Sequence, residues 1–143
     1  MKKILIIQAR FYKNISDMLL DGATSILKKN NIDYDIVDVM GALEIAPVIS
    51  MAISLKKYDG FIALGCVIRG ETYHFEIVAN ESARAISNLS TKKRVAIANG
   101  ILTTENEDQA IRRASKDNLD KGGFAALACL RMITIKEGLG IDD

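Results

Sequence analysis

The sequence has no tryptophan, a single proline, a single histidine and only two cysteines among its 143 residues. The cysteines, Cys66 and Cys129, lie far apart and take part in no CxxC or His–Cys spacing. We therefore expect no metal site, and we expect both thiols to be small core residues of a protein in the reducing cytoplasm. Aromatic residues make up only 6% of the chain, so Ile, Leu, Val and Ala must pack the core.

The chain also lacks an excess of charge of either sign. Lys and Arg number 19 against 18 Asp and Glu, and the basic residues form no stripe. The expected partner is therefore a small molecule or another protein, and neither nucleic acid nor a membrane surface is expected. No segment approaches the roughly 20 apolar residues of a membrane span. The N-terminal apolar run, residues 4–7, is too short for a secretory signal.

The sequence does contain short apolar runs that alternate with segments of helical periodicity. We expect strands at residues 3–8, 32–39, 59–65 and 94–99. We expect helices at residues 14–30, 46–57, 73–89 and 122–137, with another that starts near residue 104. Strands joined by helical crossovers pair in parallel. The sequence thus predicts one domain, residues 1–143, with an α/β fold: a doubly wound three-layer sandwich around a four-stranded parallel sheet, flavodoxin-like in arrangement.

Three of the expected helices have recognisable start signals. Asn14 is a candidate N-cap, with Asp17 placed to complement the dipole in the first turn. Pro47, the only proline, falls in a first turn, where its missing N–H does no harm. The segment from Thr104 to Glu107 has the pattern of a capping box.

Polar and aromatic residues follow each of the four expected strands. Open α/β sheets bind ligands outside the carboxyl ends of their strands, so these residues should gather at one edge. The turn of residues 70–72, Gly-Glu-Thr, precedes an expected helix, whose free N–H groups can hold an anion. The turn contains neither the GK[ST] of a Walker loop nor GxGxxG, so a small phosphorylated metabolite fits better than a nucleotide.

Each candidate residue at this edge also has a plainer interpretation. His74, the only histidine, is either a proton-transfer group or a partly exposed residue bonded to the backbone at a helix start. Glu44 could simply be a first-turn acid, and Phe11 could be a core residue. Arg113 and Lys121 could belong to a solvated surface. The residues alone lead no further than an α/β domain that binds a small anionic ligand.

Ordered segments of the sequence resemble the lumazine synthase family over nearly the whole chain. ARF at 9–11 and LLDGA at 19–23 are similar to the family's RFN…LLxGA, and GALEI at 41–45 to its GAFEIP. LGCVIRGETYHFE at 64–76, with NE at 80–81, is similar to LGCVIRGxTxHxxxVxNE, and this is the most specific segment. NGILTTENEDQAIRRA at 99–114 resembles FGVLTTxxxxQAxxRA, and KG at 121–122 resembles the closing KG.

The resemblance implies a transferase of riboflavin biosynthesis that uses no metal or organic cofactor. It would condense 5-amino-6-ribitylamino-2,4-pyrimidinedione with 3,4-dihydroxy-2-butanone 4-phosphate to 6,7-dimethyl-8-ribityllumazine, and release phosphate and water. Two other classes stay open: a non-catalytic lumazine- or flavin-binding or shell-forming homologue, and an unrelated flavodoxin-like binding module. The retained His74 and Arg113 favour the enzyme, since passive binding needs no proton shuttle.

The resemblance also implies roles for individual residues. His74 would be catalytic, and the pyrimidine and ribityl chain would be bound by Phe11, Ala42, Leu43, Glu44, Val67, Ile68, Asn99 and Lys121. The phosphate would be bound by Gly70, Glu71, Thr72 and Arg113. The sequence departs from the family pattern at Tyr12, Leu43, Asn99 and Phe124, which bears on substrate affinity more than on reaction type.

In the family Arg113 and Lys121 would reach the site from an adjacent subunit, so the resemblance implies a cytoplasmic homopentamer with shared active sites. A 60-subunit shell and association with riboflavin synthase stay open. The chain begins almost directly at its first expected strand, which favours the free pentamer.

Overall fold

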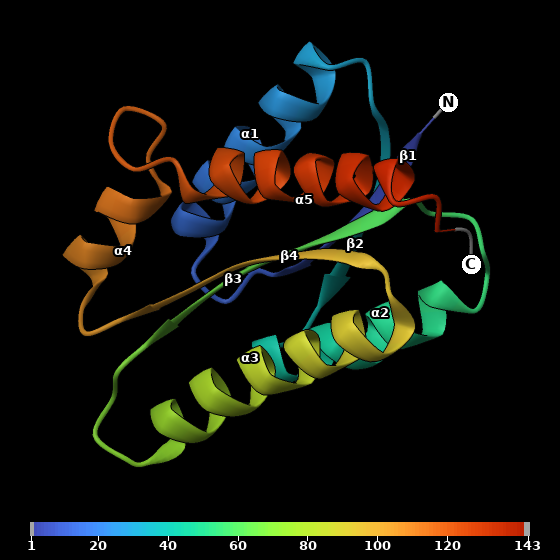
Figure 1. Cartoon of the computed structure of the whole chain (residues 1–143). Coiled ribbons are helices and arrows are strands. Elements are labelled where there is room, and N and C mark those ends of the chain that lie inside the picture. The colour runs from blue at the N-terminus through green and yellow to red at the C-terminus, as the bar shows by residue number, and fades with distance from the viewer. Residues whose placement is uncertain (1, 142–143) are drawn as a thin grey trace.

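The computed structural model describes residues 2–141 and contains one parallel sheet (Figure 1). Its strands are β1 (Lys3–Ala9), β2 (Asp33–Val39), β3 (Gly60–Ile68) and β4 (Ala96–Thr104), in the spatial order β2-β1-β3-β4. All three strand pairings are parallel. The predicted four-stranded parallel sheet is confirmed.

Helices cover both faces of the sheet (Figure 1). α1 (Lys13–Lys29) and α5 (Lys121–Gly138) lie on one face, with the short α4 (Glu107–Ala114) beside them. α2 (Ile45–Ile53) and α3 (His74–Lys93) lie on the other. The result is the predicted three-layer α/β arrangement, flavodoxin-like in its plan. No helix among residues 2–141 is long and apolar enough to cross a membrane.

The residues of β1 alternate between two hydrophobic cores. Ile4 and Ile6 pack in the core that α1 and α5 complete, whereas Leu5 and Ile7 pack in the core that α2 and α3 complete. All four side chains are at most 2% exposed. Successive side chains of a strand point to opposite faces, so a strand covered on both sides needs an unbroken apolar run. That requirement explains why the sequence indicated this strand so clearly.

The contact between α1 and α5 depends on a glycine. A Cβ atom at Gly122 would lie 2.1 Å from the carbonyl oxygen of Leu19, far inside van der Waals contact. Asp120 caps α5 in front of it, because its side chain accepts the N–H of Gly123 at 3.2 Å. The close approach fixes where Lys121, the first residue of α5, lies relative to the sheet.

Two of the predicted helix caps are wrong. α1 begins before Asn14, with Tyr12 at the N-cap position and no side-chain cap, and Asp17 is not in its first turn but pairs with Arg10. α4 is capped by Asn106, whose side chain accepts the N–H of Gln109 at 2.9 Å. Thr104 cannot serve as that cap because it is the last residue of β4.

The predicted ends of several elements also needed correction. β3 and β4 pair over nine residues each, to Ile68 and Thr104, whereas the predicted strands ended at 65 and 99. α2 is shorter than predicted and ends at Ile53, and α3 is longer and ends at Lys93. Pairing between strands supplies hydrogen bonds that no local sequence pattern reveals. These hydrogen bonds keep Gly65 and Gly100 within their strands despite the low strand propensity of glycine.

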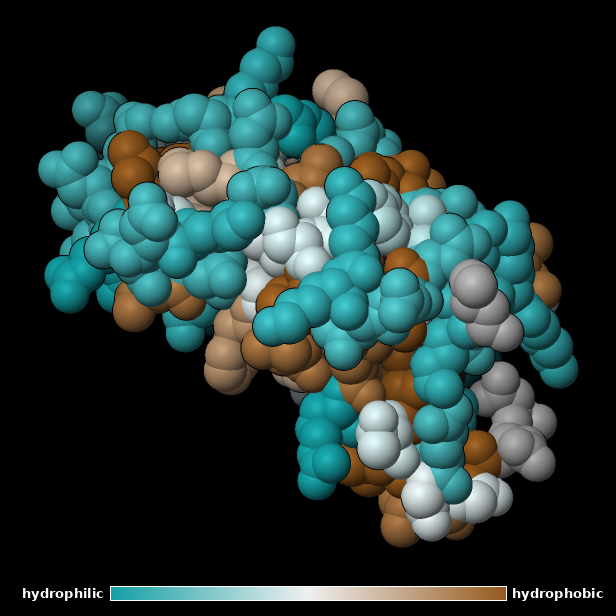
Figure 2. Space-filling view, turned by 90° about the horizontal axis from the view of Figure 1, so that it is seen from above, coloured by the Kyte–Doolittle hydropathy of each residue, from teal (hydrophilic) through white to brown (hydrophobic). Residues whose placement is uncertain are grey.

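The surface is not uniformly polar. Seen from the side of α1 and α5, hydrophobic patches lie between the hydrophilic side chains that cover most of this face (Figure 2). Cys66 and Cys129 are both buried and unbridged, as the sequence predicted. Several large hydrophobic side chains are more than 60% exposed on this single chain: Phe11, Met40, Met51, Leu55, Tyr73, Phe124 and Leu139.

Candidate active site

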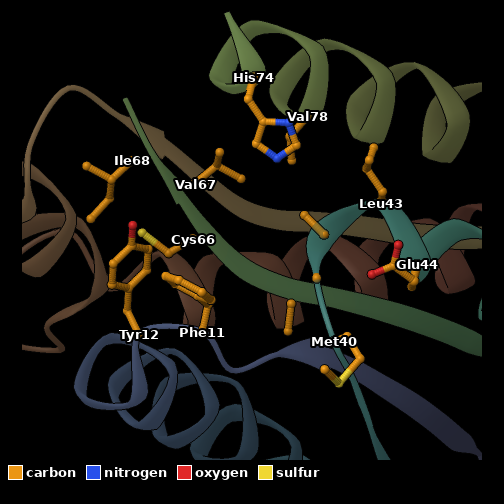
Figure 3. Close-up of a pocket in the computed structure, with 13 residues that line it drawn as sticks. Phe11, Tyr12, Met40, Leu43, Glu44, Cys66, Val67, Ile68, His74 and Val78 are labelled. Carbon is orange, nitrogen blue, oxygen red and sulfur yellow. The ribbon is translucent and has the colours of Figure 1, made fainter. Parts of the chain in front are cut away.

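A pocket of about 410 Å³ opens at the carboxyl ends of β1, β2 and β3 (Figure 3). This is the edge at which the fold class predicts a ligand. Its volume lies within the range of small-molecule sites. The pocket is lined by Ala9, Phe11, Tyr12, Met40, Gly41, Ala42, Leu43, Glu44, Cys66, Val67, Ile68, His74 and Val78.

The aromatic wall of this pocket comes from two of the three residues that connect β1 to α1. The ring of Phe11 is 77% exposed and meets the ring of Tyr12 edge to face, with centroids 4.9 Å apart. An edge-to-face neighbour supports an aromatic ring and leaves its faces available. Phe11 can therefore stack on a planar ligand, and it is not the core residue that the plainer interpretation offered.

A one-turn 3-10 helix, η1 (Ala42–Glu44), forms the wall beyond β2. The N–H of Glu44 donates to the carbonyl of Gly41 at 3.1 Å, which closes this turn. Leu43 and Glu44 are exposed and both line the pocket, whereas Ala42 is buried beneath them. The Glu44 carboxylate can accept hydrogen bonds from the hydroxyl groups of a polyol.

His74 is the first residue of α3, and its imidazole lies near Val67 and Val78 in Figure 3. It approaches the pocket from the helix, while Phe11 approaches from the end of β1. The backbone N–H of His74 donates to the Oγ1 atom of Thr72 at 3.3 Å. An imidazole at this place can give or take a proton from a ligand that rests on Phe11.

Two residues that line the pocket are held uncharged near pH 7. Burial raises the pKa of Cys66 to about 11, and the negative charge of Glu107 adds to the effect. Burial also raises the pKa of Tyr12, with smaller contributions from Cys66 and Glu107. The thiolate is the nucleophilic form of cysteine, so Cys66 is a neutral lining residue near pH 7. Among residues 2–141, no group of three or more His, Cys, Asp or Glu side chains could hold a metal ion.

The remaining residues of the predicted site lie elsewhere. The turn of residues 70–72 is exposed, precedes α3 and lines neither this pocket nor the next. Asn99, Arg113 and Lys121 line a second pocket of about 290 Å³, together with Thr103 and Phe124.

This second pocket is rich in cationic groups. Arg113 donates from Nη1 to the carbonyl of Gln109 at 3.1 Å, and the Nζ atom of Lys121 lies 5.2 Å from the ring centroid of Phe124. Neither cation forms an ion pair with an acidic residue in the described part of the chain. Both remain available to an anion, and Asn99, which is exposed, lies beside them.

The two pockets lie at the same end of the sheet but do not merge. Val67 of the first pocket pairs with Thr103 of the second across β3 and β4. β4 is the edge strand of the sheet, and the second pocket lies along it, with Arg113 from α4 and Lys121 from α5. One chain therefore does not bring Arg113 or Lys121 to His74.

Sequence reasoning missed several residues that line the first pocket. Met40 directly follows β2, so the rule that located Phe11 should have found it. Val78 lies one helical turn after His74 and shares its face of α3. Of the four departures from the family pattern, Tyr12 and Leu43 line the first pocket, and Asn99 and Phe124 line the second.

The fold and the first pocket define a class: a doubly wound α/β protein with a small-molecule site at the carboxyl edge of its sheet. Comparison with known proteins narrows this class. The family model described as 6,7-dimethyl-8-ribityllumazine synthase matches residues 1–137. The chain belongs to this family, as its motifs indicated.

Individual relatives show the same relationship. The chain is 59% identical over 138 residues to the 6,7-dimethyl-8-ribityllumazine synthase of Bartonella tribocorum, which covers 96% of this chain and 91% of that protein. It is 59% identical over 139 residues to the protein of that name from Bartonella henselae, with 96% and 90% covered. The protein of that name from Sphingopyxis alaskensis is 52% identical over 141 residues, with 99% of each chain covered.

Proposed function

We propose that this protein is a transferase that forms 6,7-dimethyl-8-ribityllumazine in riboflavin biosynthesis. It condenses 5-amino-6-ribitylamino-2,4-pyrimidinedione with 3,4-dihydroxy-2-butanone 4-phosphate and releases phosphate and water. The observation that carries the proposal is the first pocket, in which an exposed aromatic ring, a carboxylate and the only imidazole meet. Identity of 52–59% to relatives that bear this name supports it.

Each wall of the first pocket has a task in this reaction. Phe11 stacks on the pyrimidine, whose edge is read by the backbone of Val67 and Ile68. Glu44, with Ala42 and Leu43, accepts hydrogen bonds from the ribityl hydroxyls. His74 moves protons during Schiff-base formation and phosphate elimination, for which an imidazole is suited near neutral pH.

The phosphate needs fixed donors that stabilise it as it leaves. The backbone N–H groups of Gly70, Glu71 and Thr72 lie before the start of α3, where the helix dipole favours an anion. The guanidinium of Arg113 adds a charge-assisted contact. Much of the remaining rate enhancement comes from holding the two reactants together, so neither a metal nor an organic cofactor is required.

The active protein is a homopentamer in which each site is completed by a neighbour. The first pocket lacks a cation for the phosphate, and the second contains Arg113 and Lys121 without acidic partners. A ring that joins one subunit's first pocket to the next subunit's second pocket supplies both sets, and it buries part of the exposed apolar surface. Asn99 then lies beside the neighbour's pyrimidine and Lys121 beside its ribityl chain.

We place the enzyme in the cytoplasm, with residues 1–143 forming a single catalytic domain. The two buried, unbridged cysteines support that location. Light scattering on a sizing column should give a mass close to five times 15.7 kDa. A fully active monomer or dimer would contradict the shared site, whereas a sixty-subunit peak would be compatible with it.

The direct test of the activity is to mix both substrates with the purified protein and follow lumazine absorbance. The expected result is a rate well above that of the uncatalysed condensation. A rate equal to this background would overturn the proposal. Tight binding of lumazine without turnover would then identify the protein as a non-catalytic binding homologue.

A further inference from the structure

Arg69, the first residue after β3, lines neither pocket, yet its contacts extend to three segments around the site. Its backbone N–H donates to the carbonyl of Thr104 at 2.9 Å, which prolongs the pairing of β3 with β4. Its side chain donates from Nε to Glu105 at 2.8 Å and from Nη1 to Glu76. Its guanidinium carbon lies 4.6 Å from the ring centroid of Phe75.

These contacts hold together the two ends of an otherwise open turn. Residues 70–73 connect Arg69 to α3 and are all exposed. At Gly70, no heavy atom lies within 4 Å of the place a Cβ atom would occupy. Phe75 and Glu76 belong to the first turn of α3 and directly follow His74. The guanidinium thus joins the start of the turn to the helix that carries the imidazole.

A second path of contacts leads from Arg69 to the other pocket. Glu105, which accepts from Arg69, donates its backbone N–H to the side chain of Gln109 at 2.8 Å. The carbonyl of Gln109 in turn accepts from Arg113 at 3.1 Å. The position of Arg113 at the end of α4 is therefore linked to the same guanidinium as the start of α3.

The contacts suit arginine and suit a geometric role. A planar guanidinium can serve two carboxylates and stack on a ring at once, which an ammonium group cannot. The side chain of Arg69 is 41% exposed, that of Glu76 30% and that of Glu105 58%. Solvent therefore screens the attraction between these charges, and the ion pairs add little to global stability. The hydrogen bond from Arg69 holds the pKa of Glu76 below its ordinary value, so the pair stays charged near neutral pH.

We infer that Arg69 is a positioning residue, which orients His74 and the turn of residues 70–72 through Phe75, Glu76 and Glu105. This inference rests on the proposed function for its kinetic consequence but not for its structural one. The side chain does not touch the substrate. It acts through the geometry of the groups that do.

The kinetic test compares Arg69→Met and Arg69→Lys with a matched control, Arg84→Met. Arg84 and Glu81 both lie on α3, and Arg84 donates to Glu81 at 3.0 and 2.6 Å. The control therefore removes a similar exposed ion pair that lies away from both pockets. Misplaced catalytic groups can cost up to about 100-fold, so we expect kcat/KM for the phosphorylated substrate to fall between 10- and 100-fold in Arg69→Met. The kcat/KM of Arg69→Lys should lie between those of Arg69→Met and the wild type. The kcat/KM of Arg84→Met should match that of the wild type. Melting temperature and oligomer mass should stay the same in all three variants.

The structural test uses the single histidine of the chain, whose imidazole gives unambiguous NMR signals after selective labelling. In Arg69→Met these signals should shift or broaden, whereas in Arg84→Met they should not. If the wild type shows no turnover, the proposed function fails and these spectra alone decide the role of Arg69. Unchanged spectra would overturn the inference, and so would an Arg69→Met variant of an active enzyme that is as active as the control. Should Arg69→Met not fold, Glu105→Ala removes one contact of Arg69 and is held to the same outcomes.

Discussion

Mixing His74→Ala subunits with Arg113→Ala subunits should restore activity well above that of either variant alone. The two residues line different pockets of one chain, and the second pocket lies along β4, at the edge of the sheet. If a ring of subunits forms each site from one chain's His74 and the next chain's Arg113, a mixed ring contains some sites with both residues intact.

The size of the recovery follows from the geometry of the ring. In a random one-to-one mixture each interface has one chance in two of an intact His74 on one side, and the same chance of an intact Arg113 on the other. About one quarter of the sites are then complete, whatever the number of subunits in the ring. A mixture of wild type with the double variant should also give about one quarter, whereas sites formed within single chains would give about one half.

The assay requires dissociation in mild denaturant, mixing and reassembly, followed by lumazine formation per unit of protein. Each parent variant is taken through the same steps, and its mass and circular dichroism are checked before its rate is used. A mixture of the two single variants that is no more active than its parents would refute the shared site. Recovery of one half in the mixture with the double variant would do so independently.

Three further predictions test other parts of the structure. Gly122→Ala should destabilise the fold by about 1–3 kcal/mol or more, because the new Cβ would meet the Leu19 carbonyl at 2.1 Å; an unchanged urea midpoint would contradict this contact. Tyr58 donates to Asp35 at 2.7 Å, which raises the pKa of Tyr58 to about 12 and holds that of Asp35 below its ordinary value. Tyr58→Phe should therefore lower the melting temperature at neutral pH, and the deficit should shrink as the pH rises from about 10 towards 12; a deficit independent of pH would speak against the bond. His74→Ala should lower kcat by about 10–10³-fold and leave residual activity from proximity, and a folded variant with unchanged kcat between about pH 6 and 8 would exclude proton transfer by this residue.

The class of fold could be predicted because its strongest signals are local. β1 must be apolar on both faces, and its alternating contributions to two cores leave an uninterrupted run in the sequence. The ends of β3 and β4 could not be predicted, because residues 66–68 are held in the sheet by hydrogen bonds to residues 102–104. The sequence of a single segment does not reveal such pairing. The predicted cap at Thr104 was wrong for a related reason, because Thr104 is the last residue of β4.

The candidate site could be predicted only where one rule sufficed. The carboxyl-edge rule led to Phe11, Glu44 and His74, which do line one pocket. The same rule treats all four strands alike, so it could not reveal that Asn99 and Arg113 lie in a different pocket. That division depends on the strand order, which places β4 at the edge of the sheet. Only the resemblance to the family predicted that Arg113 acts in a neighbour's site.

The chemistry of the two pockets explains why this division is tolerable. Arg113 and Lys121 have no acidic partners within the described chain, and a cation near the surface keeps most of its hydration, so leaving them unpaired costs little. In the proposed ring these two cations would face a neighbour's first pocket, where the phosphate of a bound substrate can balance them.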